Sequence, residues 1–208
     1  MAEIENHNLS DLLSLPATIV VLGDTHLSRP EDRLDDELLQ QVVQQKPDLI
    51  LHTGDLMDRT VLDTLSAIAP TLAVRGNRDL KLWRQLRAIR SIRFHDQRLI
   101  LFHGYGNLPQ YLLLKTIYTI SPEKIRNADF TFPPQAKEYD FILYGHTHAA
   151  RLERKGNSVI MNPGPFSMPK SGHNWQRASF GIIRFESPEV TACTILQKNT
   201  NWHVYCKI

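Results

Sequence analysis

The sequence predicts an α/β fold in which two β-sheets share one core. In the first part of the chain, short apolar runs alternate with helix-type segments, which is the pattern of a parallel or mixed sheet covered by helices. From about residue 92 onward, β-type runs dominate instead, and they predict a second, largely antiparallel sheet. No linker-like composition separates the two parts, so we expect the sheets to pack against each other.

The first part of the chain alternates predicted strands with predicted helices. The strands are short runs of aliphatic and β-branched residues: 17–22, 48–52 and 71–75. The helices are predicted over 34–45, where Pro47 enforces the end, and near 60–68. Each of the three strands leads into a glycine followed by Asp or Asn.

The second part consists mainly of predicted strands. Residues 91–105 indicate two strands around a turn at Asp96-Gln97. Further β-type runs are found at 140–144, 149–161, 178–185, 189–197 and 201–207. Between them, 109–120 is predicted to be helical and 121–138 irregular. This longer segment contributes aromatic residues that either pack in the core or line a pocket wall: Tyr105, Tyr111, Tyr118 and Phe130.

The first 16 residues are interpreted as an N-terminal extension of a single domain that spans 17–208. Several leucines of the extension suit a short helix, which would pack on the core or on a second subunit, and a frayed tail is the alternative. They are Leu9, Leu12, Leu13 and Leu15. The sequence therefore leaves open whether the protein forms a homo-oligomer.

Composition narrows the function classes. Of the 208 residues, 42% are hydrophobic and 22% charged, with a formal net charge of +2, which are ordinary values for a globular domain. The charge is too small to indicate a nucleic-acid or membrane-surface binder, and we see no dedicated nucleic-acid-binding domain. Two cysteines, no signal peptide and no apolar run of about 20 residues predict a cytoplasmic protein with reduced thiols and no membrane segment.

Candidate ligand residues follow the apolar runs. They occur in five blocks that each combine glycine with Asp, Asn or His: Gly23-Asp24-Thr25-His26, Gly54-Asp55, Gly76-Asn77, His103-Gly104 and Gly145-His146-Thr147-His148. In open α/β sheets, ligands bind beyond the carboxyl ends of the strands, so we expect these blocks to converge. Residues two apart on an extended segment project to the same side, so each paired block can address one site.

The donor types predict a metal centre for phosphoester chemistry. Two aspartates, one asparagine and four histidines form a mixed oxygen and nitrogen set, which suits Mn²⁺, Fe²⁺, Zn²⁺ or Co²⁺ better than Ca²⁺. Seven ligands exceed the four of a tetrahedral zinc site. They suit two metals about 3.5–4 Å apart, which activate a water and clamp the attacking and leaving oxygens of a phosphoester.

As an ordered set, the blocks DTH, GDLMD, GNRD, HG and GHTH resemble the calcineurin-like metallophosphoesterases. The short length and the late NPGP motif resemble the small single-domain bacterial and archaeal phosphodiesterase branch, to which a retromer scaffold subunit is related. The resemblance extends from residue 18 to about 185. It implies a four-layer α/β/β/α sandwich with two facing mixed sheets.

The resemblance also implies a role for each ligand. Asp24, His26 and His148 would bind the first metal, Asp55 would bridge, and the second metal would complete its shell with Asn77, His103 and His146. Two divalent ions are expected, with Mn²⁺ favoured and Fe, Zn, Ni or Co as alternatives, and a bridging hydroxide would attack the phosphorus. The loop Asn162-Pro163-Gly164 would shape the rim of the pocket.

The catalytic residues implied are Asn77, Arg78 and Asp79. Asn77 can contact a substrate phosphate through its amide nitrogen. Many relatives carry His at the position of Arg78 to protonate the leaving group, whereas an arginine supplies a fixed charge and no proton at neutral pH. We expect Asp79 to position Arg78, and turnover to be modest and strongest on activated aryl phosphodiesters.

Two further polar residues lie close to the motif blocks. His52 is interpreted as a strand residue packed beneath the site, and Asp58 as a residue supporting the site or starting a helix. The leading hypothesis is a phosphodiesterase acting on a small-molecule phosphoester. The alternatives are a phosphomonoesterase or nucleotidase with the same metals, and a non-catalytic scaffold for protein partners.

Overall fold

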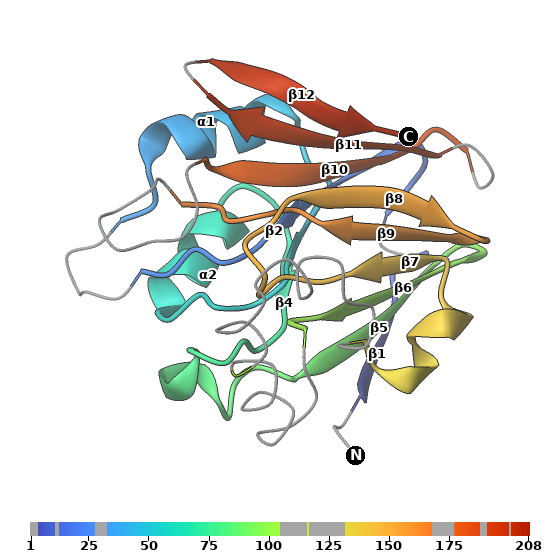
Figure 1. The fold of residues 1–208 in the computed structure, drawn as a ribbon, viewed down its shortest axis with the longest axis horizontal. Coiled ribbons are helices and arrows are strands. Elements are labelled where there is room, and N and C mark those ends of the chain that lie inside the picture. The colour runs from blue at the N-terminus through green and yellow to red at the C-terminus, as the bar shows by residue number, and fades with distance from the viewer. Residues whose placement is uncertain are drawn as a thin grey trace.

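Two facing β-sheets form the centre of the molecule (Figure 1). The computed structural model describes residues 4–10, 13–27, 33–104, 116, 132–167, 177–187, 191–199 and 201–208. The helix expected at 109–120 and the aromatic side chains of Tyr105, Tyr111, Tyr118 and Phe130 lie outside the described residues. The order of elements within the described ranges confirms the α/β class and the arrangement in two mixed sheets.

The first sheet combines early and late strands of the chain. Its order is β12 (Trp202–Lys207), β11 (Thr191–Lys198), β10 (Ser179–Phe185), β2 (Ala17–Leu22), β3 (Leu49–His52) and β4 (Thr71–Ala73). Strands β2, β3 and β4 are parallel, and β10 joins β2 antiparallel. We expected the C-terminal strands in the second sheet, and this was wrong. Strand β10 is an almost completely buried apolar run, which favours a position between two neighbouring strands.

The second sheet is mixed rather than largely antiparallel. Its order is β1 (Ile4–Asn8), β5 (Ile89–Phe94), β6 (Gln97–Phe102), β7 (Phe141–Leu143), β9 (Ser158–Asn162) and β8 (Arg151–Lys155). The β5–β6 and β8–β9 pairs are antiparallel, as tight turns allow. The β6–β7 and β7–β9 pairs are parallel. Parallel pairing requires a long crossover, and the segment between β6 and β7 provides one.

The N-terminal residues add a strand to the second sheet. Strand β1 pairs in parallel with β5, from Ile4 opposite Ile89 to Asn8 opposite Arg93. Leu9 is buried, and Leu13 and Leu15 pack against the core between the sheets. The strand over 4–8 was not expected. The described residues among 9–16 form no helix, and Leu12 lies outside the described residues. An isolated sequence pattern did not indicate this strand because its pairing partner is more than 80 residues away.

Helices complete the layers outside the two sheets. Helices α1 (Asp36–Gln44) and α2 (Arg59–Ser66) pack their buried residues against the outer face of the first sheet. Asp35 and Asp58 cap their N-termini, which confirms the helix-start alternative for Asp58. A 3-10 helix, η3 (Pro134–Glu138), packs outside the second sheet. Among the described residues, no helix is long and apolar enough to cross a membrane.

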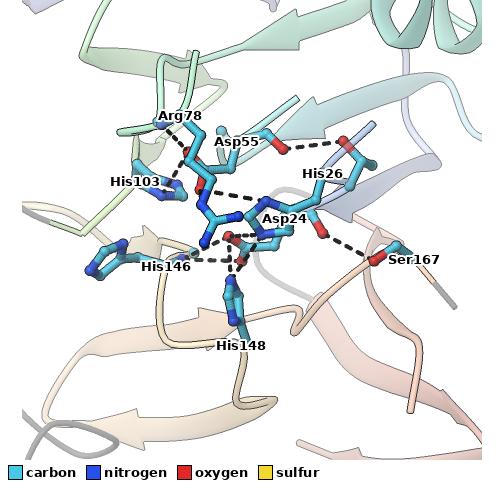
Figure 2. A network of polar contacts seen from close by, with 12 residues as sticks. Asp24, His26, Asp55, Arg78, His103, His146, His148 and Ser167 are labelled. Carbon is cyan, nitrogen blue, oxygen red and sulfur yellow. Dashed lines mark hydrogen bonds and ion pairs between the residues drawn. The ribbon is translucent and has the colours of Figure 1, made fainter. Parts of the chain in front are cut away.

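The fold brings the motif blocks to one edge. Strands β2, β3 and β4 are parallel, as are β6 and β7, so within each sheet the loops after these strands emerge on the same side. The apolar cluster between the sheets packs the two sheets face to face. The loops of both sheets then meet around a single polar cluster (Figure 2).

Candidate metal centre

The loops that follow β2, β3, β4, β6 and β7 carry the seven candidate ligands. All seven side chains lie in the described residues, and the close-up shows how those from the two sheets face one another (Figure 2). Asp24, His26, Asp55 and His103 are buried. The convergence expected from the sequence is therefore present in the structure, whereas the role of each residue as a ligand remains a prediction.

The first group combines the β2 loop with the β7 loop. The Nε2 atoms of His26 and His148 lie 3.0 Å apart, and the Oδ1 atom of Asp24 lies 3.4 Å from His148 Nε2 and 3.8 Å from His26 Nε2. These atoms form a cluster compatible with one metal ion. Ligand atoms about 2.1 Å from an ion at right angles are about 3.0 Å apart, so the spacing fits cis ligands.

The second group combines loops from both sheets. The Oδ1 atom of Asn77 lies 3.1 Å from His103 Nε2 and 3.0 Å from His146 Nδ1. The Nε2 atom of His103 is also 3.4 Å from Asp55 Oδ1. A second cluster compatible with an ion contains Asp24, Asp55 and His103. The donor set and its spacing therefore fit a second divalent ion beside the first.

Asp55 lies between the two groups. Its Oδ1 atom faces His103 at 3.4 Å, and its Oδ2 atom faces His26 Nδ1 at 3.9 Å. The family resemblance implies Asp55 as the bridging ligand, and that role remains a prediction. Asp24 belongs to both compatible clusters, so its carboxylate lies close to both groups of ligands.

Electrostatics divide three of the histidines in the site into two kinds. Burial lowers the pKa of His26 and of His146 to about 4, so both rings are neutral and can donate a lone pair to a metal. Burial also acts to lower the pKa of His103, but the neighbouring Asp55 carboxylate outweighs it and raises this pKa to about 9. The Asp55 carboxylate therefore favours the protonated form of His103.

The two carboxylates remain ionised despite their burial. Burial opposes ionisation of Asp24, but His148 and His103 hold the pKa of this carboxyl below its ordinary value. Burial likewise opposes ionisation of Asp55, but His103 and the backbone N–H of Arg78 hold its pKa well below the usual range. The site thus keeps two buried negative charges, which is a costly arrangement unless cations balance them.

Backbone strain is concentrated in the same loops. Of eight non-glycine residues with positive φ in the described part of the chain, six belong to these loops, with φ between 52° and 73°, in the left-handed region that costs about 1–3 kcal/mol for such residues. They are Asp24, His26, Asp55, Met57, His146 and His148. Five of these six residues are candidate ligands, which indicates that ligand direction takes precedence over local backbone preference there.

Several buried groups hold the ligands in place. The Nδ1–H of His103 donates to the carbonyl oxygen of Thr53 over 2.9 Å, which leaves Nε2 for the centre of the site. The Asn162 amide donates to Gly145 O and Thr147 Oγ1, each at 3.0 Å. Asn162 is fully buried, so it supports the β7 loop instead of forming the pocket rim. The NPG motif was noted in the sequence, but the sequence did not indicate that Asn162 bonds to Gly145 and Thr147.

His52 packs beneath the site, in agreement with the interpretation of the sequence. Its Nδ1 atom accepts from the Gly54 N–H at 3.1 Å, and its Nε2 atom lies 3.5 Å from the Thr25 hydroxyl. The Thr25 hydroxyl in turn donates to the carbonyl oxygen of Asp55 at 3.3 Å. This chain of contacts joins the β2 and β3 loops, and the role of Thr25 in it was missed at the level of sequence.

Arg78 and Asp79 follow Asn77 but point to different partners. The Arg78 side chain is 54% exposed, and its Nε atom lies 4.0 Å from Asp55 Oδ2, so its charge borders the site (Figure 2). Asp79 was expected to position Arg78. Its fully buried carboxylate instead accepts backbone N–H groups from Asp55, Met57 and Gly76.

Comparisons with known proteins identify relatives of this chain. The calcineurin-like phosphoesterase superfamily domain matches residues 18–187. A probable metallophosphoesterase of Methanocaldococcus jannaschii is 27% identical over 165 residues, which is 79% of this chain and 76% of that protein. Phosphodiesterase YfcE of Escherichia coli K12 is 25% identical over 171 residues, which is 79% of this chain and 71% of YfcE.

Solved structures show the same fold at lower identity. A crystal structure of Vps29 from Entamoeba histolytica complexed with zinc has a TM-score of 0.66 at 17% identity, covering 92% of this chain and 98% of that one. The E. coli YfcE structure has a TM-score of 0.61 at 21% identity, with 92% and 98% covered. The match of the superfamily domain to most of the chain shows that this protein belongs to the calcineurin-like phosphoesterase superfamily.

Proposed function

We propose that the protein is a dimetal phosphoesterase that acts preferentially on phosphodiesters. The observation that carries the proposal is the convergence of seven oxygen and nitrogen donors from five strand ends, four of them buried, with spacings of 3.0–3.9 Å. Two buried carboxylates beside four histidines and an asparagine form a mixed oxygen and nitrogen site that favours divalent cations.

The residues divide into two ligand sets. Asp24, His26 and His148 would hold one ion. Asn77, His103 and His146 would hold the other, with Asp55 shared between them. When bound, two such metal ions would supply Lewis acidity and lower the pKa of a coordinated water, which is the chemistry that phosphoester hydrolysis requires. Mn²⁺ is our first choice of metal, with Fe, Zn, Ni and Co as alternatives, and the zinc-bound Vps29 structure supports a divalent ion in this fold.

The protein's own residues orient and stabilise the substrate. The Nδ1–H bond to Thr53 O fixes the His103 ring, so its other nitrogen keeps a constant direction. Arg78 places a guanidinium at the edge of the site, where it can bind a phosphate oxygen and stabilise charge that develops there. Arg78 donates no proton at neutral pH, so phosphodiesters with good leaving groups are the favoured substrates.

Phosphodiester preference is also supported by the name of the relative YfcE, a phosphodiesterase. A phosphomonoesterase would use the same ligands and differ at the rim. A scaffold function is suggested by the fold-level similarity to Vps29, of which one structure holds a cyclic peptide. The complete donor set argues for hydrolysis over a purely scaffolding role, since every one of the seven positions carries a metal-binding side chain.

The test is hydrolysis of bis-p-nitrophenyl phosphate and p-nitrophenyl phosphate by metal-stripped protein. Mn²⁺, Zn²⁺, Ni²⁺ and Mg²⁺ are supplied in turn. We expect metal-dependent cleavage that is faster for the diester. Faster cleavage of the monoester would favour the phosphomonoesterase. Absence of turnover with every metal, in a folded protein that binds two ions, would reject the enzyme and favour the scaffold.

A further inference from the structure

Asp79 is a fully buried carboxylate that lies behind the candidate metal ligands. Its Oδ2 atom accepts the backbone N–H of Asp55 at 2.9 Å and that of Gly76 at 2.7 Å. Its Oδ1 atom accepts the backbone N–H of Met57 at 2.7 Å. Three short bonds from two different loops therefore end on one side chain.

The three N–H groups form a concave anion-binding site in the backbone. Asp55 and Met57 have φ values of 59° and 70°, and such left-handed residues within a turn direct successive N–H groups toward one point. A carboxylate at that point stabilises the conformation, because its charge strengthens every bond it accepts. Asp79 thus stabilises two non-glycine residues in backbone conformations that they rarely adopt.

The loop of Asp79 also contacts the Asp55 side chain from the other side. A Cβ atom on Gly76 would lie 2.1 Å from Asp55 Oδ1, so only glycine allows the two loops to approach so closely. The backbone N–H of Arg78 donates to the same Oδ1 atom over 2.8 Å. The residues 76–79 therefore hold Asp55 at its backbone through Asp79 and at its carboxylate through Arg78.

We propose that Asp79 is a positioning residue that aims the Asp55 carboxylate at both metal positions. The inference rests on the proposed function, because it assigns Asp79 a role in metal binding. Both oxygens of Asp79 are needed: Oδ1 serves Met57, and Oδ2 serves Asp55 together with Gly76. An asparagine side chain at this position would have only one oxygen. Its NH₂ group would therefore face at least one backbone N–H, and two donors cannot form a hydrogen bond with each other.

The test is a calorimetric titration of Mn²⁺ into the metal-stripped protein, with no substrate present. The variants are Asp79→Asn and the control Asp48→Asn. The control removes a carboxylate that accepts a backbone N–H, from Thr18 at 2.8 Å, but at the opposite end of strand β3. We expect Asp79→Asn to weaken Mn²⁺ binding about 10- to 100-fold, as the loss of a group behind metal ligands does elsewhere. Asp48→Asn should bind like the wild type.

Thermal unfolding of the metal-free proteins separates positioning from plain stability. Equal Mn²⁺ affinity in Asp79→Asn and wild type, with only a lower Tm, would overturn the inference and leave the proposed function intact. Should Asp79→Asn not fold, Asp79→Glu, which keeps two oxygens but displaces them, must show the weakened binding. Unfolding of both variants beside a folded Asp48→Asn would assign Asp79 a purely structural role. A wild type that binds no divalent ion would reject the proposed function itself.

Discussion

The parallel pair β2–β3 is held together differently at its two ends. At the amino end, the exposed Asp48 exchanges two bonds with Thr18, each 2.8 Å long, one backbone to backbone and one through its carboxylate. At the carboxyl end, Asp24 and Asp55 are buried, and both have positive φ. The amino end joins two strands through an exposed carboxylate, whereas the carboxyl end places desolvated charge on residues with left-handed backbone.

The second sheet repeats this difference. At the amino ends of β6 and β7, Asp140 exchanges a backbone bond of 2.9 Å and a carboxylate bond of 2.8 Å with Arg98. At their carboxyl ends lie His103 and the strained His146. Departures from local preference are expected where function requires them. The comparison therefore favours the carboxyl end of both sheets as the candidate functional end, without reference to any relative.

The largest expected difference between the two ends is in catalysis. Asp55→Asn keeps the shape of the side chain but removes the charge shared by both ligand groups. We expect hydrolysis of bis-p-nitrophenyl phosphate to fall at least about 10³-fold, which corresponds to about 4 kcal/mol. Asp48→Asn, at the amino end, should retain the wild-type rate. Similar losses in both variants would mean that the two ends are not functionally distinct.

The rise in thermal stability on addition of metal also distinguishes the two ends. Mn²⁺ at 100 times its dissociation constant should stabilise the folded protein by about 2.7 kcal/mol per site. For a domain of this size, that corresponds to a rise in Tm of roughly 5–11 °C for one site. Differential scanning fluorimetry of wild type, Asp48→Asn and Asp55→Asn measures it. Asp48→Asn should show the same rise in Tm as the wild type, and Asp55→Asn should lose most of it. A rise of the same size in all three proteins would mean that the metal binds elsewhere.

A smaller effect is expected for Arg78, whose side chain is half exposed. Arg78→Ala should lower kcat/KM for the aryl diester about 10- to 100-fold, because a charge-assisted bond to the phosphate is lost. Arg78→Lys should restore part of the rate, since it keeps the charge but not the paired geometry. Steady-state kinetics at low and high salt would show the charge contribution. An unchanged rate in Arg78→Ala would exclude substrate contact.

The smallest effect is on acid stability and concerns His52, beneath the site. Burial lowers its pKa to about 3, against about 6.5 in an unfolded chain. Because the folded pKa is the lower one, the neutral ring stabilises the protein fully above pH 6.5, and this contribution is lost as the pH falls toward 3. The loss is at most about 1.4 kcal/mol per pH unit.

The variant His52→Gln does not titrate and should remove this dependence. Urea unfolding of metal-free wild type and His52→Gln at pH 7, 6 and 5 provides the measurement. We expect the free energy of unfolding to fall more steeply with acid in the wild type. Parallel pH dependence in the two proteins would show that His52 is not held neutral by burial.

The strand ends that carry the ligands could be read from the sequence. Strand β2 was predicted with its observed limits, because an apolar run that ends at a glycine has few other interpretations. The convergence of the five blocks followed from the rule that parallel strands end together. Spacing also placed Asp24 near His26, as observed. It did not show that His148 lies beside these two residues while His146 lies beside Asn77.

The missing parts depend on contacts between distant residues. The bond from Asp55 to Asp79 spans 24 residues and joins a side chain to a backbone group, which no periodicity reports. Strand β1 contains charged and polar residues, and only its partner β5 makes it a strand. The C-terminal strands were placed in the wrong sheet because an apolar run specifies burial but not the neighbouring strand.

The position of β1, β11 and β12 has a practical consequence for anyone who shortens this protein. The superfamily match spans 18–187, and all three strands lie outside it. A protein cut at those limits would lack β1 beside β5, and β11 and β12 beside β10. The backbone N–H and C=O groups along β5 and β10 would then be unpaired beside apolar side chains. Exposed sheet edges of this kind pair with other chains, so we expect the shortened protein to aggregate and to accumulate in inclusion bodies on expression.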